Sequence, residues 1–167
     1  VYIAMNAVYQ TALSFTSQNY GAGKMNRVTK ILLYCLGLVV MVGAVMGGGA
    51  VLIGPKLLQI YSSDPEVISY GMMRMRIING SYFLCGIMDT MVGGLRGLGY
   101  SVVPMLVSLT GACLFRVVWI FSVFAMHRTL TTLYISYPVS WIITFTAHII
   151  CYIVIRKRIA ARRKPRD

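Results

Sequence analysis

One carboxylate lies inside an apolar stretch of this chain. The stretch covers residues 77–99 and reads IINGSYFLCGIMDTMVGGLRGLG, with Asp89 near its centre. The other acidic residues are Asp64 and Glu66, which fall in a polar segment, and Asp167, which is the last residue. An ionisable side chain inside a membrane-spanning segment is costly, and such residues mark functional sites. Asp89 is therefore the first candidate for binding a cation or exchanging a proton.

Several other polar residues are further candidates for a functional site. His148 lies about 10 Å inside the same membrane boundary, because seven residues separate each side chain from the end of its apolar run. We expect Asp89 and His148 to share a proton or a water molecule. Asn79, in the same stretch as Asp89, is a third candidate for binding the coupling ion or a substrate. Asn6 and Gln10 share one helical face, which either lines a water-filled cavity or makes hydrogen bonds between helices.

An aromatic stripe is predicted near the C-terminus. It contains residues at spacings of four, three, four and four, namely Tyr137, Trp141, Thr144, His148 and Tyr152. Tyr137, Trp141 and Thr144 are candidates for lining a cavity that takes flat cations through cation–π contacts. The alternative is that the stripe packs against other helices, with its ends in the interfacial aromatic belt.

Arg116 is the second charge deep in an apolar run. A positive side chain would oppose a cationic ligand, so we predict a structural role for it. That role is either an ion pair, with Asp89 as the candidate partner, or packing. A structural pairing of this kind is also the alternative to a functional role for Asp89.

The composition indicates the elements that position these residues. About 57% of the residues are hydrophobic and 12% are charged, whereas a soluble domain has roughly 25% charged residues. Residues 31–55 and 129–155 contain no Asp, Glu, Lys or Arg, and runs of this length fit membrane-spanning helices. We predict an all-α, polytopic transmembrane helix bundle with spans at about 1–19, 31–54, 77–96, 101–125 and 131–155. The sequence Ser63-Asp64-Pro65-Glu66 predicts a helix start ahead of the third span.

The basic residues are concentrated at the C-terminus. The net charge is +12, and seven of the sixteen basic residues follow Ile155 in the segment RKRIAARRKPRD. We interpret residues 156–167 as a basic cytoplasmic tail beside anionic lipid headgroups. This predicts a multi-pass protein of the cytoplasmic membrane whose partner is the lipid bilayer and not nucleic acid.

The sequence contains no motif typical of an enzyme. It has no P-loop, no dinucleotide-binding fingerprint and no set of residues with metal-ligand spacing. Its four cysteines fall one in each of four apolar runs and show no CxxC spacing. We therefore predict a protein that is not an enzyme, with no cofactor, no metal and reduced cysteines that pack as small apolar side chains.

Short motifs in a fixed order resemble the multidrug and toxic compound extrusion (MATE) family. The first is Ser-Gln-Asn-Tyr-Gly-Ala-Gly at residues 17–23, followed by a basic loop. The second is Leu-Arg-Gly-x-Gly at residues 95–99, which leads into a run with an early proline, Pro104. The Arg116 span and the Tyr-Pro-x-Ser-Trp sequence at residues 137–141 are also similar to bacterial members.

The resemblance implies a transporter of twelve helices in two bundles of six. The chain would be the C-terminal bundle from partway along its second helix, and we expect a fragment whose partner is the missing N-terminal bundle of the same protein. The family exports drugs and other small organic cations, and either sodium or proton entry drives the export. Asp89 would lie in the tenth helix, where part of the family has an acid linked to the coupling cation. In some members that acid aligns with Cys85, one turn earlier.

Two other functions are compatible with the residues. The first is a lipid-linked oligosaccharide flippase of related fold, which would need more cationic residues deep in its spans than Arg116 alone. The second is a non-transporting membrane scaffold, which leaves Asp89 unexplained.

Overall fold

The computed structural model describes residues 1–162, which form helices joined by short loops with no strand among them. Three helices, one of them running continuously over residues 102–124, are long and apolar enough to cross a membrane. The predicted transmembrane helix bundle is thereby confirmed. The elements in chain order are α1 (Tyr2–Gly21), α2 (Met25–Leu52), α3 (Gly54–Gln59), α4 (Pro65–Gly80), α5 (Tyr82–Gly97), α6 (Val102–Ser108), η1 (Leu109–Leu114), α7 (Phe115–Trp119), η2 (Ile120–Phe124) and α8 (Leu130–Arg162).

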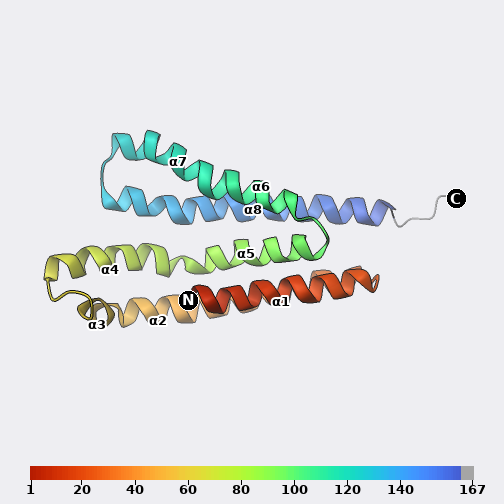
Figure 1. Cartoon of the computed structure of the whole chain (residues 1–167), viewed down its shortest axis with the longest axis horizontal. Coiled ribbons are helices and arrows are strands. Elements are labelled where there is room, and N and C mark those ends of the chain that lie inside the picture. The colour runs from red at the N-terminus through yellow and green to blue at the C-terminus, as the bar shows by residue number, and fades with distance from the viewer. Residues whose placement is uncertain (163–167) are drawn as a thin grey trace.

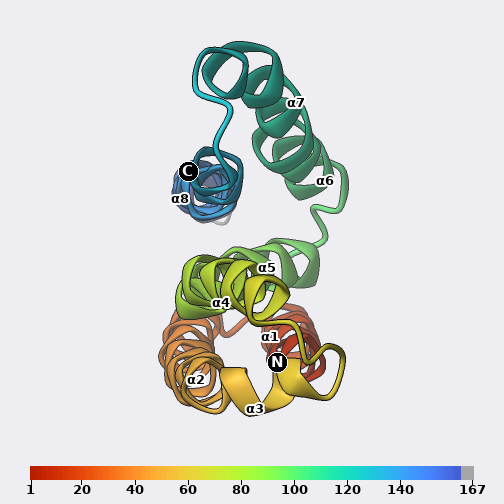
Figure 2. The ribbon, with the colours of Figure 1, turned by 90° about the vertical axis from the view of Figure 1, so that its left-hand side faces the viewer.

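The longer helices run side by side along the long axis of the molecule (Figure 1). Viewed from one end, α4 and α5 form a middle layer, with α1, α2 and α3 on one side and α8 on the other (Figure 2). In the same view, α6 lies beside α8, and α7 lies farther from α5 than α8 does (Figure 2). The middle layer therefore carries Asp89 between the two groups of helices.

Close packing fixes α5 against α1. A Cβ atom added at Gly93 would lie 2.8 Å from the backbone oxygen of Tyr9, and one added at Gly97 would lie 2.6 Å from Cβ of Thr16. Both distances are too short for a side chain, so the two glycines let the backbones approach, as small residues do between membrane helices. The register between α1 and α5 is set by this contact.

Two buried clusters hold α5 and its neighbours together. One joins α2, α5 and α8 through Val28, Leu32, Met91, Leu95, Leu98, Tyr152, Ile155 and Ile159. The other joins α1 to α2 through Met5, Val8, Ala12, Cys35 and Val39. The C-terminal half of α5 is thus packed against α1, α2 and α8, and this packing fixes the position of its side chains.

The predicted third span is interrupted at Ser81, which separates α4 from α5. The Ser81 hydroxyl donates back to the carbonyl oxygen of Ile77, and Gly80 precedes it. Gly/Ser pairs and such back-bonds bend helices, because they compete with the regular backbone ladder. The predicted start of α4 is confirmed: Asp64 is its N-cap and accepts a hydrogen bond from the backbone N–H of Glu66 at 2.8 Å.

The helix formed by α6, η1, α7 and η2 runs antiparallel to α8. Near its start, Ser108 Oγ is 3.1 Å from Nε2 of His148. Farther along, Arg116 Nε donates to Ser140 Oγ at 3.0 Å. Between these contacts lies η1, a π-helical segment, and wide turns of this kind occur often at functional sites.

The expected tail begins as a helix. Residues 156–162 continue α8 without a break, because Arg, Lys and Ala favour helix and no breaker follows Ile155. The rest of the predicted tail, residues 163–167, lies outside the described residues.

Candidate functional site

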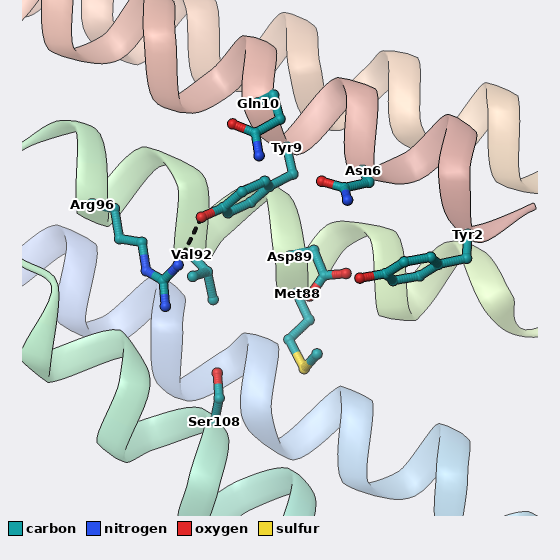
Figure 3. Close-up of a pocket in the computed structure, with 9 residues that line it drawn as sticks. All are labelled: Tyr2, Asn6, Tyr9, Gln10, Met88, Asp89, Val92, Arg96 and Ser108. Carbon is teal, nitrogen blue, oxygen red and sulfur yellow. Dashed lines mark hydrogen bonds between the residues drawn. The ribbon is translucent and has the colours of Figure 1, made fainter.

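A cavity of about 450 Å³ lies between α1 and α5 and is bordered by one residue of α6. Figure 3 shows the nine residues that line it. Four come from α1 and four from α5, and the complete set is Tyr2, Asn6, Tyr9, Gln10, Met88, Asp89, Val92, Arg96 and Ser108.

Helical spacing places these side chains on facing surfaces. On α5, Met88, Val92 and Arg96 are four residues apart, so they lie along one face, and Asp89 is beside them on that surface. The α1 residues recur at spacings of four, three and one from Tyr2, which also describes a single stripe. Because the two helices are in close contact at Gly93, the stripes oppose each other.

Asp89 supplies the negative charge of the cavity. It is half-buried, and its carboxylate and the Tyr2 hydroxyl point toward one another (Figure 3). Among the described residues, the other acids are Asp64 and Glu66 at the start of α4. No other carboxylate of residues 1–162 therefore lies in the cavity.

Arg96 lies on the same face of α5, at the edge of the cavity. Its Nη1 atom donates a hydrogen bond of 2.8 Å to the hydroxyl of Tyr9 (Figure 3). This bond links the last turn of α5 to α1, and Arg96 is exposed at the end of the bundle. The cavity thus has a carboxylate in its wall and a guanidinium at its edge.

The structure brings together three of the predicted site residues, namely Asn6, Gln10 and Asp89. Asn79 is elsewhere, because it lies on α4 beyond the Ser81 break, and its backbone oxygen is against Gly47 of α2. Its predicted part in ion or substrate binding stays a prediction.

The aromatic stripe faces other helices of this chain. Trp141 is 4% exposed and Thr144 is fully buried. Trp141 makes edge-to-face contacts with Tyr82, at 5.7 Å between ring centroids, and with Tyr137, at 6.0 Å. Tyr152 is within hydrogen-bond distance of Thr29, with 3.2 Å between the two hydroxyl oxygens. None of the five stripe residues borders the Asp89 cavity, so the role of Tyr137, Trp141 and Thr144 in lining a binding surface stays a prediction.

Arg116 is held by aromatic faces. Its Cζ atom lies 4.1 Å from the ring centroid of Tyr137 and 5.8 Å from that of Trp141, while Nε donates to Ser140. Of the two structural roles predicted for Arg116, an ion pair and packing, these contacts fit packing. Within residues 1–162, the guanidinium has no ion pair with Asp89.

His148 is fully buried and reaches the cavity indirectly. Its Nε2 atom is hydrogen-bonded to Ser108 Oγ, and Ser108 borders the cavity. The described residues show no hydrogen bond between His148 and Asp89, so the expected sharing of a proton is not a direct contact in this structure.

Sequence reasoning did not identify Tyr2, Tyr9 or Ser108 as site residues. The two tyrosines follow from the same periodicity that identified Asn6 and Gln10, because Tyr2, Asn6 and Tyr9 are spaced four and three apart. Ser108 had no such signal, since it enters the cavity from a helix whose position depends on the packing of α8.

The lining residues determine which kinds of ligand this cavity can attract. Within residues 1–162, no group of three His, Cys, Asp or Glu side chains could hold a metal ion. The lining contains the Asp89 carboxylate, the amides of Asn6 and Gln10, the aromatic rings of Tyr2 and Tyr9 and, at the edge, the Arg96 guanidinium. A carboxylate and aromatic faces attract cations.

A sequence model of the MatE family matches residues 1–122, which is well over half of the chain. No curated protein and no solved structure matches.

Proposed function

The chain belongs to the MatE family, whose members are membrane transporters, and we propose that the complete protein is an antiporter that exports organic cations. Entry of sodium ions or protons drives this export. The chain supplies the C-terminal bundle, and the N-terminal bundle of the same protein completes the transport path. Alternating exposure of the binding site to the two sides of the membrane then moves the substrate.

The observation that carries the proposal is the position of Asp89 in the cavity between α1 and α5. A carboxylate inside a membrane protein binds a cation or takes up a proton, because an unpaired negative charge there is costly. If the coupling ion and the cationic substrate compete for Asp89, only one of them occupies the site at a time. Competition of this kind is sufficient to couple the inward flow of one to the outward flow of the other.

The distribution of basic residues supports an orientation. The α1–α2 loop, the α5–α6 loop and the end of α8 lie at the same end of the bundle (Figure 1). That end has Lys24, Arg27, Lys30 and Arg96, and the last turns of α8 add Arg156, Lys157, Arg158 and Arg162. By the positive-inside rule, we assign this end and the C-terminus to the cytoplasmic side of the cytoplasmic membrane.

The test uses the complete protein in proteoliposomes loaded with a fluorescent organic cation. An imposed sodium or proton gradient should drive transport by the unmodified protein. The Asp89→Asn variant keeps the size of the side chain but removes its charge, and we expect it to lose at least about tenfold in gradient-driven transport. Asp89→Glu should retain part of the activity.

Asp64→Asn is the matched control, because Asp64 is an acid at the start of α4 and Asn also caps helices well. We expect normal transport from this variant. Unchanged transport and unchanged ion dependence in Asp89→Asn would refute the role of Asp89 in coupling.

A further inference from the structure

Ser108 connects the cavity to a buried histidine. Its hydroxyl borders the cavity and points from α6 toward α5 (Figure 3). The same oxygen is 3.1 Å from Nε2 of His148 on α8. His148 is 0% exposed, so Ser108 is the polar group through which the imidazole meets the cavity.

The surroundings of His148 determine which way the Ser108 hydrogen bond runs. The Nδ1 atom is buried and has no hydrogen-bond partner among residues 1–162. A neutral imidazole has one N–H donor and one acceptor nitrogen. A proton on Nδ1 would leave a buried N–H without an acceptor, which proteins rarely tolerate. The proton is therefore assigned to Nε2, which donates to Ser108 Oγ.

With its oxygen accepting from His148, Ser108 still has its own proton to donate. Other helical hydroxyls donate to a backbone oxygen of their own helix, as Thr110 does to Leu106 at 2.8 Å and Ser122 to Val118 at 2.6 Å. Within the described chain, Ser108 makes no such bond. Its O–H group is thus available on the side that faces the cavity.

We propose that Ser108 donates a hydrogen bond to the ligand in this cavity and that His148 is the positioning residue that orients it. The ligand class is an organic cation that also has an acceptor oxygen, such as an ester or ketone carbonyl. The cationic group is bound near Asp89, which rests on the proposed function, and the acceptor oxygen is bound by Ser108.

If the hydrogen bond between Ser108 and His148 only held α6 against α8, a different result would be expected. In that case Ser108 and His148 would affect the stability of the protein and would weaken all ligands alike. A ligand-binding role affects only ligands with an acceptor oxygen. The two roles are therefore separated by comparing the effect of each variant on two cationic probes, one with an acceptor oxygen and one without.

The experiment measures binding to the purified complete protein in detergent. Rhodamine 6G has an ester carbonyl, whereas tetraphenylphosphonium contains neither oxygen nor nitrogen. We expect Ser108→Ala to raise the Kd for rhodamine 6G about fivefold, the ratio that matches one net hydrogen bond, with no change for tetraphenylphosphonium. Ser108→Thr, which keeps the hydroxyl, should restore the affinity. Ser122→Ala on the same helix is the control and should change neither Kd.

His148 is tested through its coupling to Ser108. His148→Leu should also raise the Kd for rhodamine 6G, but it should add no further loss in the Ser108→Ala background, because the hydrogen bond is already absent there. Equal losses for both probes, or no loss for rhodamine 6G in Ser108→Ala, would overturn the proposal. A fully additive effect of His148→Leu would overturn the positioning role.

Asp89→Asn separates this inference from the proposed function. Removal of the carboxylate should weaken both probes, because both are cations. If Asp89→Asn weakens neither probe, the cation-binding function is refuted, whereas the difference between the two probes in Ser108→Ala still decides the role of Ser108.

Discussion

Replacing Gly93 by alanine tests the close contact on which the cavity depends. The new Cβ atom would lie 2.8 Å from the backbone oxygen of Tyr9 and 3.1 Å from its ring, while ordinary contact begins at 3.4 Å. Because a backbone oxygen cannot rotate away, α1 has to move by about 0.6 Å, the difference between 3.4 and 2.8 Å. Overpacking of this kind costs about 1–3 kcal/mol.

The matched control is Gly37→Ala on α2, where a Cβ atom would meet nothing within 4 Å. Both variants gain about 0.5–1 kcal/mol from the higher helix propensity of alanine. The difference between them therefore isolates the packing cost, and we expect Gly93→Ala to be less stable than Gly37→Ala by about 1–3 kcal/mol.

The assay is thermal unfolding of the purified complete protein in detergent. We expect the lowest unfolding midpoint for Gly93→Ala, a higher one for the unmodified protein and the highest for Gly37→Ala. Because Tyr9 also borders the cavity, Gly93→Ala should in addition weaken binding of a cationic probe, whereas Gly37→Ala should not. An unfolding midpoint for Gly93→Ala at or above that of Gly37→Ala would show that α1 and α5 are not in the close contact described.

Two further predictions concern Arg116 and the start of α4. Tyr137→Leu removes the ring 4.1 Å from the Arg116 guanidinium and should cost about 1–2 kcal/mol in unfolding free energy. Tyr137→Phe keeps the ring face and should cost much less, and equal losses in thermal unfolding would contradict the cation–π contact. Asp64→Ala removes the acceptor of the Glu66 N–H and should cost about 1 kcal/mol locally, seen as faster hydrogen exchange in the first turn of α4 without a change in transport. Unchanged exchange there would contradict the cap.

The parts of the fold that follow from local rules were predictable from the sequence. Apolar runs gave the helical bundle, and the capping pattern at Asp64 and Pro65 gave the start of α4. The Ser81 break was not predicted, because the apolar run around it fits one continuous span, and a Gly/Ser pair can bend a helix without ending it.

The candidate site was predictable only on the helices whose faces show a clear period. Asp89 stood out by its charge, and Asn6 and Gln10 by their spacing. Ser108 depends on how α6 packs against α8, and the two partners of its contact are forty residues apart. A contact of that sequence separation follows from the packing of the helices, which no periodicity within one segment reveals.

The π-helical segment η1 also affects how the chain tolerates a change in length. Ser108 and Arg116 are eight residues apart, which in a regular α-helix would place them about 80° apart around the axis. A π-turn holds one extra residue, so the two side chains lie on nearly one face, as residues seven apart would, and both contact α8. Deleting one residue within η1 would convert the π-turn to a regular turn and leave Ser108 and Arg116 on the face that contacts α8. A deletion in a regular helix such as α2 rotates every residue beyond it by about 100°.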